Sequence, residues 1–307
     1  MIVLLMRRPL LMGPLFACAM SCSSPTAQVD GGATSGYTKV DDMEGGPAIE
    51  WMPPPGLLPG AWYTVSDCIG AGDLWPPPPI VTAGTLTPSI WSYSELPTPH
   101  ETFSGILSTH AARLRTTSPI IGQFAAMGIT LARQPGLTVE IVSTGGSDAG
   151  GPMPDASSGG QALCPVIRGD EGSVDLSAYS GVTFWAKGDP TGVRTIQVKL
   201  QDLHTDPRGG ICNDADTSNP DACYNGFSTT IALTGSFAQY TIDFASLQQD
   251  PHWGYRPDPD VLDAQHVYQL VFEIFPPTCY LHEMCVGGSP PPVSFDFWID
   301  DLYFVNK

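Results

Sequence analysis

Charged residues are scarce in this sequence, and basic residues are the scarcest of them. Charged residues make up 14% of the 307 residues, and 13 lysines and arginines stand against 31 aspartates and glutamates, a formal net charge of −18. Nucleic-acid binding needs a basic surface, so this balance argues against a nucleic-acid partner. No run beyond the N-terminal segment reaches the ~18 consecutive apolar residues that span a membrane.

The sequence also lacks the common motifs of hydrolytic enzymes. It has no Gly-x-Ser-x-Gly elbow and no His-Glu-x-x-His pair, of which His282-Glu283 is only a fragment. A glycosidase needs two carboxylates in one cleft, and no pattern isolates such a pair among the 31 acidic residues. We therefore assign no catalytic residue and keep a glycoside hydrolase as a lesser alternative.

Glycine and proline are abundant, at 33 and 31 residues, and 42% of the chain is hydrophobic. This composition favours short strands and turns over helices. Segments such as 195–202 alternate apolar and polar residues, as half-buried strands do. Roughly ten such segments separated by turn signals predict an all-β fold, an antiparallel β-sandwich with long Pro/Gly-rich loops.

The closing stretch, residues 295–305, predicts a central strand of this sandwich. Strict alternation places Phe297, Ile299 and Tyr303 on one face and Asp300 and Leu302 on the other. Both faces are largely apolar, so we expect the strand to be covered on two sides. Its adjacent carboxylates must then be paired, hydrogen-bonded or bound to a metal.

The N-terminus is typical of an export signal. Arg7-Arg8 precede an apolar stretch, 9–16, and small residues follow. Residues 1–22 resemble a bacterial lipoprotein signal, with Cys22 as the lipidated residue, and Cys18 is a second candidate. A plain cleaved signal without a lipid is the alternative, and translation starts at Met1 or at Met6.

A polar, small-residue tether is predicted for 23–38, a folded domain for 39–307, and a surface insertion for about 143–162. Six cysteines remain in an exported chain, which favours disulfides over zinc sites. Short separations favour two of the pairings, and elimination leaves the third: Cys212–Cys223, Cys279–Cys285 and Cys68–Cys164.

Several motifs carry a resemblance to a known family. They are the opening Asp41-Asp42-Met43-Glu44-Gly45, the strand Phe184-Trp185-Ala186-Lys187 and the ending Trp298-Ile299-Asp300-Asp301. In this order they resemble the galactose-binding-domain-like β-jelly roll of non-catalytic carbohydrate-binding modules, especially those in bacterial lipoproteins. The resemblance covers about 39–307. It implies a structural Ca²⁺ between the first and last strands, held by Glu44 and Asp300 and supported by Asp42 and Asp301.

A glycan site needs flat aromatic rings and polar side chains for hydroxyl groups. Loop aromatics next to a glycine are the strongest candidates, although such rings often cover the core instead. The candidate ligand-binding residues are Trp253, Tyr255, His252, Trp185, Tyr224 and Asp202.

These observations predict an exported monomer, either anchored to the outer membrane or extracellular, that binds a glycan or polysaccharide at the bacterial cell surface. A structural or adhesion lipoprotein of the envelope that binds a protein partner is the alternative from a different class.

Overall fold

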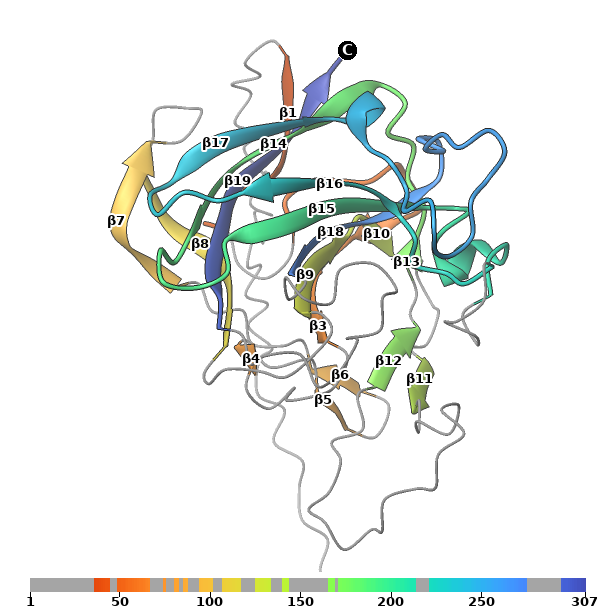
Figure 1. The fold of residues 1–307 in the computed structure, drawn as a ribbon, viewed down its shortest axis with the longest axis horizontal. Coiled ribbons are helices and arrows are strands. Elements are labelled where there is room, and N and C mark those ends of the chain that lie inside the picture. The colour runs from red at the N-terminus through yellow and green to blue at the C-terminus, as the bar shows by residue number, and fades with distance from the viewer. Residues whose placement is uncertain are drawn as a thin grey trace, which may run out of the picture. The chain divides into compact units, whose positions relative to one another are not determined.

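Two large antiparallel sheets form most of the described secondary structure in the computed structural model (Figure 1). The structure describes residues 36–44, 49–66, 74–75, 80–82, 85–87, 94–101, 107–116, 125–133, 140–143, 165–168, 171–213, 221–274 and 294–307. The predicted lipidation residues, the other predicted disulfides and the 143–162 insertion lie outside these ranges, apart from Ser143.

The first sheet has seven strands and the second has five. The seven-stranded sheet runs in the order β17 (Ala238–Asp243), β14 (Tyr179–Gly188), β19 (Asp296–Asn306), β8 (Leu107–Thr116) and β4 (Leu74–Trp75), with β1 (Tyr37–Asp41) on β19 and β7 (Ser94–Glu101) on β8. The five-stranded sheet runs β16 (Phe227–Ala232), β15 (Thr195–Asp202), β18 (Val267–Ile274), β9 (Ala125–Thr130) and β3 (Trp62–Ser66).

Smaller pairings complete the described secondary structure. They are β2 (Leu58–Pro59), β10 (Ala132–Arg133) and β13 (Glu171–Gly172); β11 (Glu140–Ser143) and β12 (Pro165–Arg168); and β5 (Ile80–Thr82) and β6 (Thr85–Thr87). In the described ranges, helix is limited to the 3-10 turns η2 (Pro207–Gly209) and η3 (Phe244–Ser246). None of the described helices could cross a membrane.

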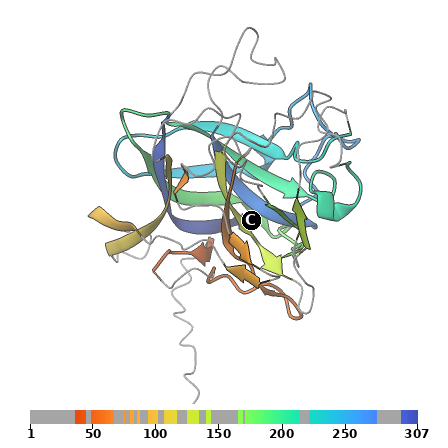
Figure 2. The same ribbon diagram turned by 90° about the horizontal axis from the view of Figure 1, so that it is seen from below.

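Successive strands cross from one sheet to the other, which is the connectivity of a jelly roll. β8 leads to β9, β14 to β15, β16 to β17, and β18 to β19, and each of these steps changes sheet. The two sheets lie on opposite sides of the core (Figures 1 and 2). The ring of Phe184 on β14 meets the ring of Phe272 on β18 edge-on, with centroids 5.1 Å apart. The prediction of an all-β antiparallel sandwich is confirmed.

The last strand is central, as predicted, because β19 lies between β14 and β8. The predicted strict alternation along it is wrong. Asp301 adopts a left-handed backbone with φ 48°, and the pairing with β14 shifts register between Thr183 and Trp185. Such a bulge adds a residue to one strand. Leu302 therefore faces the core on the same side as Ile299.

The folded part begins slightly earlier than predicted. Tyr37 and Thr38, the last residues of the predicted tether, already pair with Val305 and Phe304 of β19. The main chain of Trp51 donates a hydrogen bond to Val40 O at 2.8 Å, which places Trp51 beside β1. The first and last strands of the domain are thus neighbours, as the resemblance implied.

Candidate functional site

The loop between η3 and β18 forms a pocket of about 300 Å³. Three of the predicted ligand-binding residues, His252, Trp253 and Tyr255, line it. The remaining lining residues are Asp221, Pro251, Gly254 and Arg256. The structure therefore gathers the aromatic loop residues favoured from the sequence around one cavity.

Asn225 gives this loop its shape. Its side-chain oxygen accepts a hydrogen bond from Asp250 N at 3.0 Å, and its Nδ2 donates to Asp250 O at 3.1 Å and to Trp253 O. Asp250 Oδ1 accepts from His252 N at 2.8 Å. Gly254 has φ 67°, and a Cβ there would lie 2.5 Å from Asn225 Cβ. Only glycine fits this backbone conformation without strain.

The loop is also joined to the chain beside a disulfide. The predicted Cys212–Cys223 disulfide is present. Beside it, Ala222 O accepts a hydrogen bond from Tyr255 N at 2.8 Å, and Gln249 Nε2 donates to Tyr255 O at 2.9 Å. The pocket is therefore built on backbone positions fixed by neighbouring elements.

The pocket lining offers aromatic rings and charged groups. The ring of His204 stacks on that of Tyr255, with centroids 6.3 Å and planes 15° apart. Asp221 supplies a carboxylate, and Arg256 pairs with Asp260. Such a pocket can stack a flat apolar face and hydrogen-bond to hydroxyl groups.

Asp202, another predicted ligand-binding residue, lies in a buried turn. Its Oδ1 accepts hydrogen bonds from His204 N at 3.1 Å and from Thr205 Oγ1 at 2.9 Å, and its Oδ2 accepts from Asp263 N at 2.8 Å. Burial raises the pKa of Asp202 above its ordinary value, although these hydrogen bonds oppose the rise. This residue positions the turn and does not line the pocket.

The last two predicted ligand-binding residues also lie outside the pocket lining. Tyr224 has φ 75° and donates its backbone N–H to Thr205 O at 2.7 Å, next to the disulfide. Trp185 is half-buried on the outer face of the seven-stranded sheet, opposite Asp300.

Sequence analysis missed a polar network on the outer face of the five-stranded sheet. Tyr63 Oη donates to Gln269, whose Nε2 donates to Gln201 and to Asp206 Oδ2, the latter at 2.9 Å. The ring of Tyr63 occupies the space where a side chain on Gly128 would lie. The outward polar positions of 195–202 signalled a polar face, but they did not reveal which strands pair with it.

Two of the predicted calcium ligands meet at one side chain. The hydroxyl of Ser108 on β8 lies 2.6 Å from Asp300 Oδ2 and 3.2 Å from Glu44 Oε1. It also lies 2.9 Å from His110 O. One hydroxyl donates a single hydrogen, so it cannot serve all three of these oxygens at once. Glu44 Oε1 also accepts a hydrogen bond from His110 N at 2.8 Å. These oxygens come from three segments of the chain and fit the hard ligand set that Ca²⁺ prefers.

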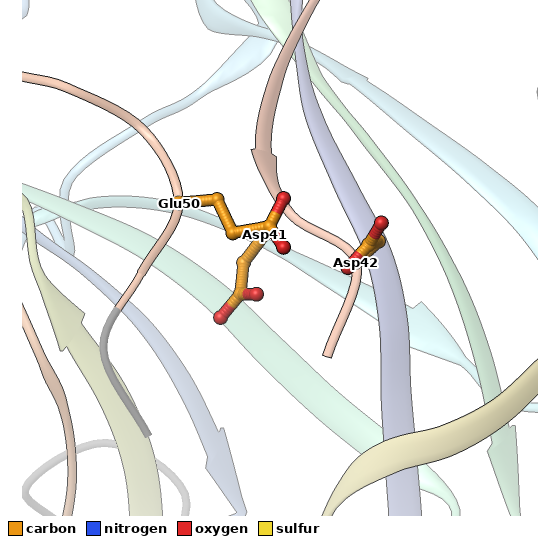
Figure 3. Close-up of side chains that lie close together, drawn as sticks. All are labelled: Asp41, Asp42 and Glu50. Carbon is orange, nitrogen blue, oxygen red and sulfur yellow. The ribbon is translucent and has the colours of Figure 1, made fainter. Parts of the chain in front are cut away.

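The other two predicted ligands, Asp42 and Asp301, do not belong to this group of oxygens. Asp42 lies with Asp41 and Glu50 in a cluster whose carboxylate oxygens are within 4.8 Å of one another (Figure 3). Lys39 Nζ lies 3.0 Å from Asp42 Oδ2 and also pairs with Glu50. An ammonium group therefore already neutralises part of this cluster.

The cluster perturbs its neighbours strongly. Burial, opposed by hydrogen bonds from Trp62 and Met43, raises the pKa of Asp41 to about 7. Burial and the charge of Asp301 raise the pKa of Tyr303 above its ordinary value. Burial would lower the pKa of Lys39, but its bonds to the two acids raise it instead. Among the described residues, Asp301 is therefore close enough to Tyr303 to affect its pKa.

Family profiles and the sequences of curated proteins give no match to this chain. Solved structures give distant likenesses. A family 11 carbohydrate-binding module from Clostridium thermocellum, in complex with a β-1,3-1,4-mixed-linked tetrasaccharide, is 12% identical with a TM-score of 0.38, covering 88% of this chain and 96% of that one. The family 30 module of cellulosomal cellulase Cel9D-Cel44B from the same organism is 13% identical with a TM-score of 0.32, covering 71% and 89%.

An exo-β-agarase is 10% identical with a TM-score of 0.34, and the match covers 68% of this chain and 22% of the enzyme. At these values the likenesses do not identify a ligand for this chain.

Proposed function

We propose that this protein binds a glycan without cleaving it, through the pocket of the 250–256 loop. The observation that supports the proposal is the pocket lining, which combines the rings of Trp253 and Tyr255 with the charged groups of Asp221 and Arg256. Rings stack on the apolar faces of sugars, and charged or amide groups bind their hydroxyls. Hydrogen bonds from Asn225 and Gln249 hold the backbone of the two ring-bearing residues in place before a ligand arrives.

Non-catalytic binding fits this lining better than hydrolysis does. Glycoside cleavage needs two carboxylates roughly 5 to 10 Å apart on either side of the bond. Among the described residues that line the pocket, Asp221 is the one carboxylate, and the Arg256 side chain is paired with Asp260. Turnover of a chromogenic glycoside by the purified protein would establish the hydrolase alternative.

The test is a glycan array followed by titration of the best ligand. We expect Trp253→Ala to lower its affinity tenfold or more, a loss of about 1.4 kcal/mol or above. Tyr37→Ala, which truncates a half-buried ring on β1, is the control and should bind as the wild type does. Retained binding in Trp253→Ala, with loss in Tyr63→Ala, would move the site to the five-stranded sheet. No glycan binding, with capture of an envelope protein, would favour the adhesion alternative.

We also propose that Glu44, Asp300 and Ser108 hold a structural Ca²⁺. The approach of both carboxylates to one hydroxyl supports this, because a cation would relieve the repulsion between them. Added Ca²⁺ should raise the melting temperature of chelator-treated protein, since a ligand of the folded state stabilises it. Glu44→Gln should abolish the rise, whereas Asp42→Asn, in the Lys39 cluster, should keep it. An unchanged melting temperature with no heat of binding would refute the site.

The proposed location is the outer membrane or the extracellular space, with the protein acting as a monomer. The lipoprotein-like segment supports anchoring through Cys22. Labelled palmitate should enter the wild type but not Cys22→Ser. Incorporation lost only in Cys18→Ser would move the anchor to that residue, and no incorporation would favour a plain cleaved signal.

A further inference from the structure

Four side chains form a row across the outer face of the seven-stranded sheet, alternating ring and cation. Register places Lys187 on β14 opposite Trp298 on β19, and Trp298 opposite Arg113 on β8. Phe237 stands just before β17 and packs against Trp298. Lys187 Nζ lies 4.2 Å from the ring centroid of Trp298 and 5.1 Å from that of Phe237, and the Arg113 guanidinium carbon lies 4.4 Å from the Trp298 centroid. We call these four residues the cationic row.

The two cations of the row are neutralised unequally. Arg113 forms a two-point ion pair with Asp296, with Nε 2.7 Å from Oδ1. In the described part of the chain, the contacts of Lys187 are the two ring faces and no carboxylate lies within ion-pair distance. A cation–π contact supplies only about 0.5–2 kcal/mol. A partly buried ammonium group on aromatic rings is therefore still stabilised further when an anion binds beside it.

Electrostatics supports the same view. Burial lowers the pKa of Lys187, and repulsion from Arg113 lowers it further, while Asp296 acts in the opposite direction. The other groups that face Lys187 from β19 and the start of β17 are the uncharged rings of Trp298 and Phe237. An anion bound beside Lys187 would raise the pKa of its ammonium group again.

We propose that Lys187 anchors a second binding site, on the outer face of the seven-stranded sheet, for the anionic group of an acidic polysaccharide. The half-buried rings of Trp185 and Phe237 flank the anchor and can pack against the sugar that carries the anion. The net charge of −18 does not prevent this, since exposed charges beyond about 8 Å are screened at physiological salt. The carboxylate of a uronate and a sulfate ester share the required chemistry.

The experiment compares three soluble polymers on the mature protein by affinity electrophoresis or calorimetry: polygalacturonate, dextran sulfate and neutral dextran. Binding to at least one acidic polymer and not to dextran is expected, and the acidic polymer that binds more tightly identifies the anion. Lys187→Gln should lower that affinity about tenfold, the value of one charge-assisted hydrogen bond. Lys307→Gln makes the same charge change at an exposed position and should leave the affinity unchanged.

The dependence on pH adds a second readout. Because the pKa of Lys187 is lowered, the wild type should lose affinity for the acidic polymer at a lower pH than an exposed lysine would impose. Lys187→Arg should keep the binding and remove that loss, since arginine stays protonated. Equal losses in Lys187→Gln and Lys307→Gln, or equal binding of dextran, would overturn the proposal. Trp253→Ala should leave binding of the acidic polymer intact. This variant therefore distinguishes failure of the Lys187 proposal from failure of the proposed glycan pocket.

Discussion

The lysines on the outer faces of the two sheets have different partners. Each sheet buries an apolar inner face, and each has a lysine on the outside of a central strand. On the five-stranded sheet Lys199 forms an ion pair with Glu273, and their side chains are only 10% and 7% exposed. On the seven-stranded sheet Lys187 lies against rings.

On the five-stranded sheet the buried lysine has a carboxylate partner within the protein. On the seven-stranded sheet the lysine has aromatic rings in place of a carboxylate. Burial penalises a charge unless a partner compensates, and Glu273 supplies that partner for Lys199. Nearby, Gln269 links Tyr63, Gln201 and Asp206 in one network. The charged groups on the outer face of the five-stranded sheet therefore stabilise the fold. The cationic row, by contrast, can bind an anionic ligand.

The largest effect should come from removing Glu273. Glu273→Ala leaves Lys199 buried without its carboxylate partner, so we expect the free energy of unfolding to fall by about 3–5 kcal/mol. Denaturant unfolding monitored by circular dichroism measures it. The double variant Lys199→Met with Glu273→Leu should recover most of the loss, because no buried charge remains. A loss below about 1 kcal/mol in the single variant would show that water already reaches the pair.

A smaller effect is expected from Gln269→Leu. The substitution preserves bulk but removes the hydrogen-bond partner shared by Tyr63, Gln201 and Asp206. Leaving buried polar groups unmatched costs about 1–3 kcal/mol. Tyr63→Phe removes only one bond of the network and should cost about 1 kcal/mol. Equal stability of Gln269→Leu and the wild type would mean that the network adds no stability.

The strands of both faces could be predicted from the sequence, but the partners of these lysines could not. Alternation in 195–202 places Lys199 on the polar face, and the Phe-Trp-Ala-Lys segment places Lys187 beside Trp185. Pairing depends on register between strands far apart in the chain, such as Lys187 with Trp298. A single left-handed residue, Asp301, also reverses the faces of β19, and residue type alone does not specify it.

In the pocket, too, residues close together in the sequence could be predicted, whereas contacts between distant segments could not. The aromatic residues of 250–256 could be chosen because a glycine stands among them. Asn225, which braces the loop through three hydrogen bonds, carries no signal in the sequence. Asp202 is among the predicted ligand-binding residues, yet its carboxylate is fully buried in a turn. Whether a carboxylate faces solvent or backbone amides depends on packing that periodicity does not encode.

The smallest effect should come from Lys187→Met, and its comparison with Lys199→Met gives the clearest contrast between the faces. Lys199→Met leaves Glu273 buried and uncompensated, so it should cost several kcal/mol, as Glu273→Ala does. Lys187→Met loses cation–π contacts of about 0.5–1 kcal/mol but also removes a desolvated charge that Arg113 repels. Its unfolding free energy should therefore stay within about 1 kcal/mol of the wild type. If the two variants lose equal stability, Lys187 is matched within the protein and the cationic row has no vacancy for an anion.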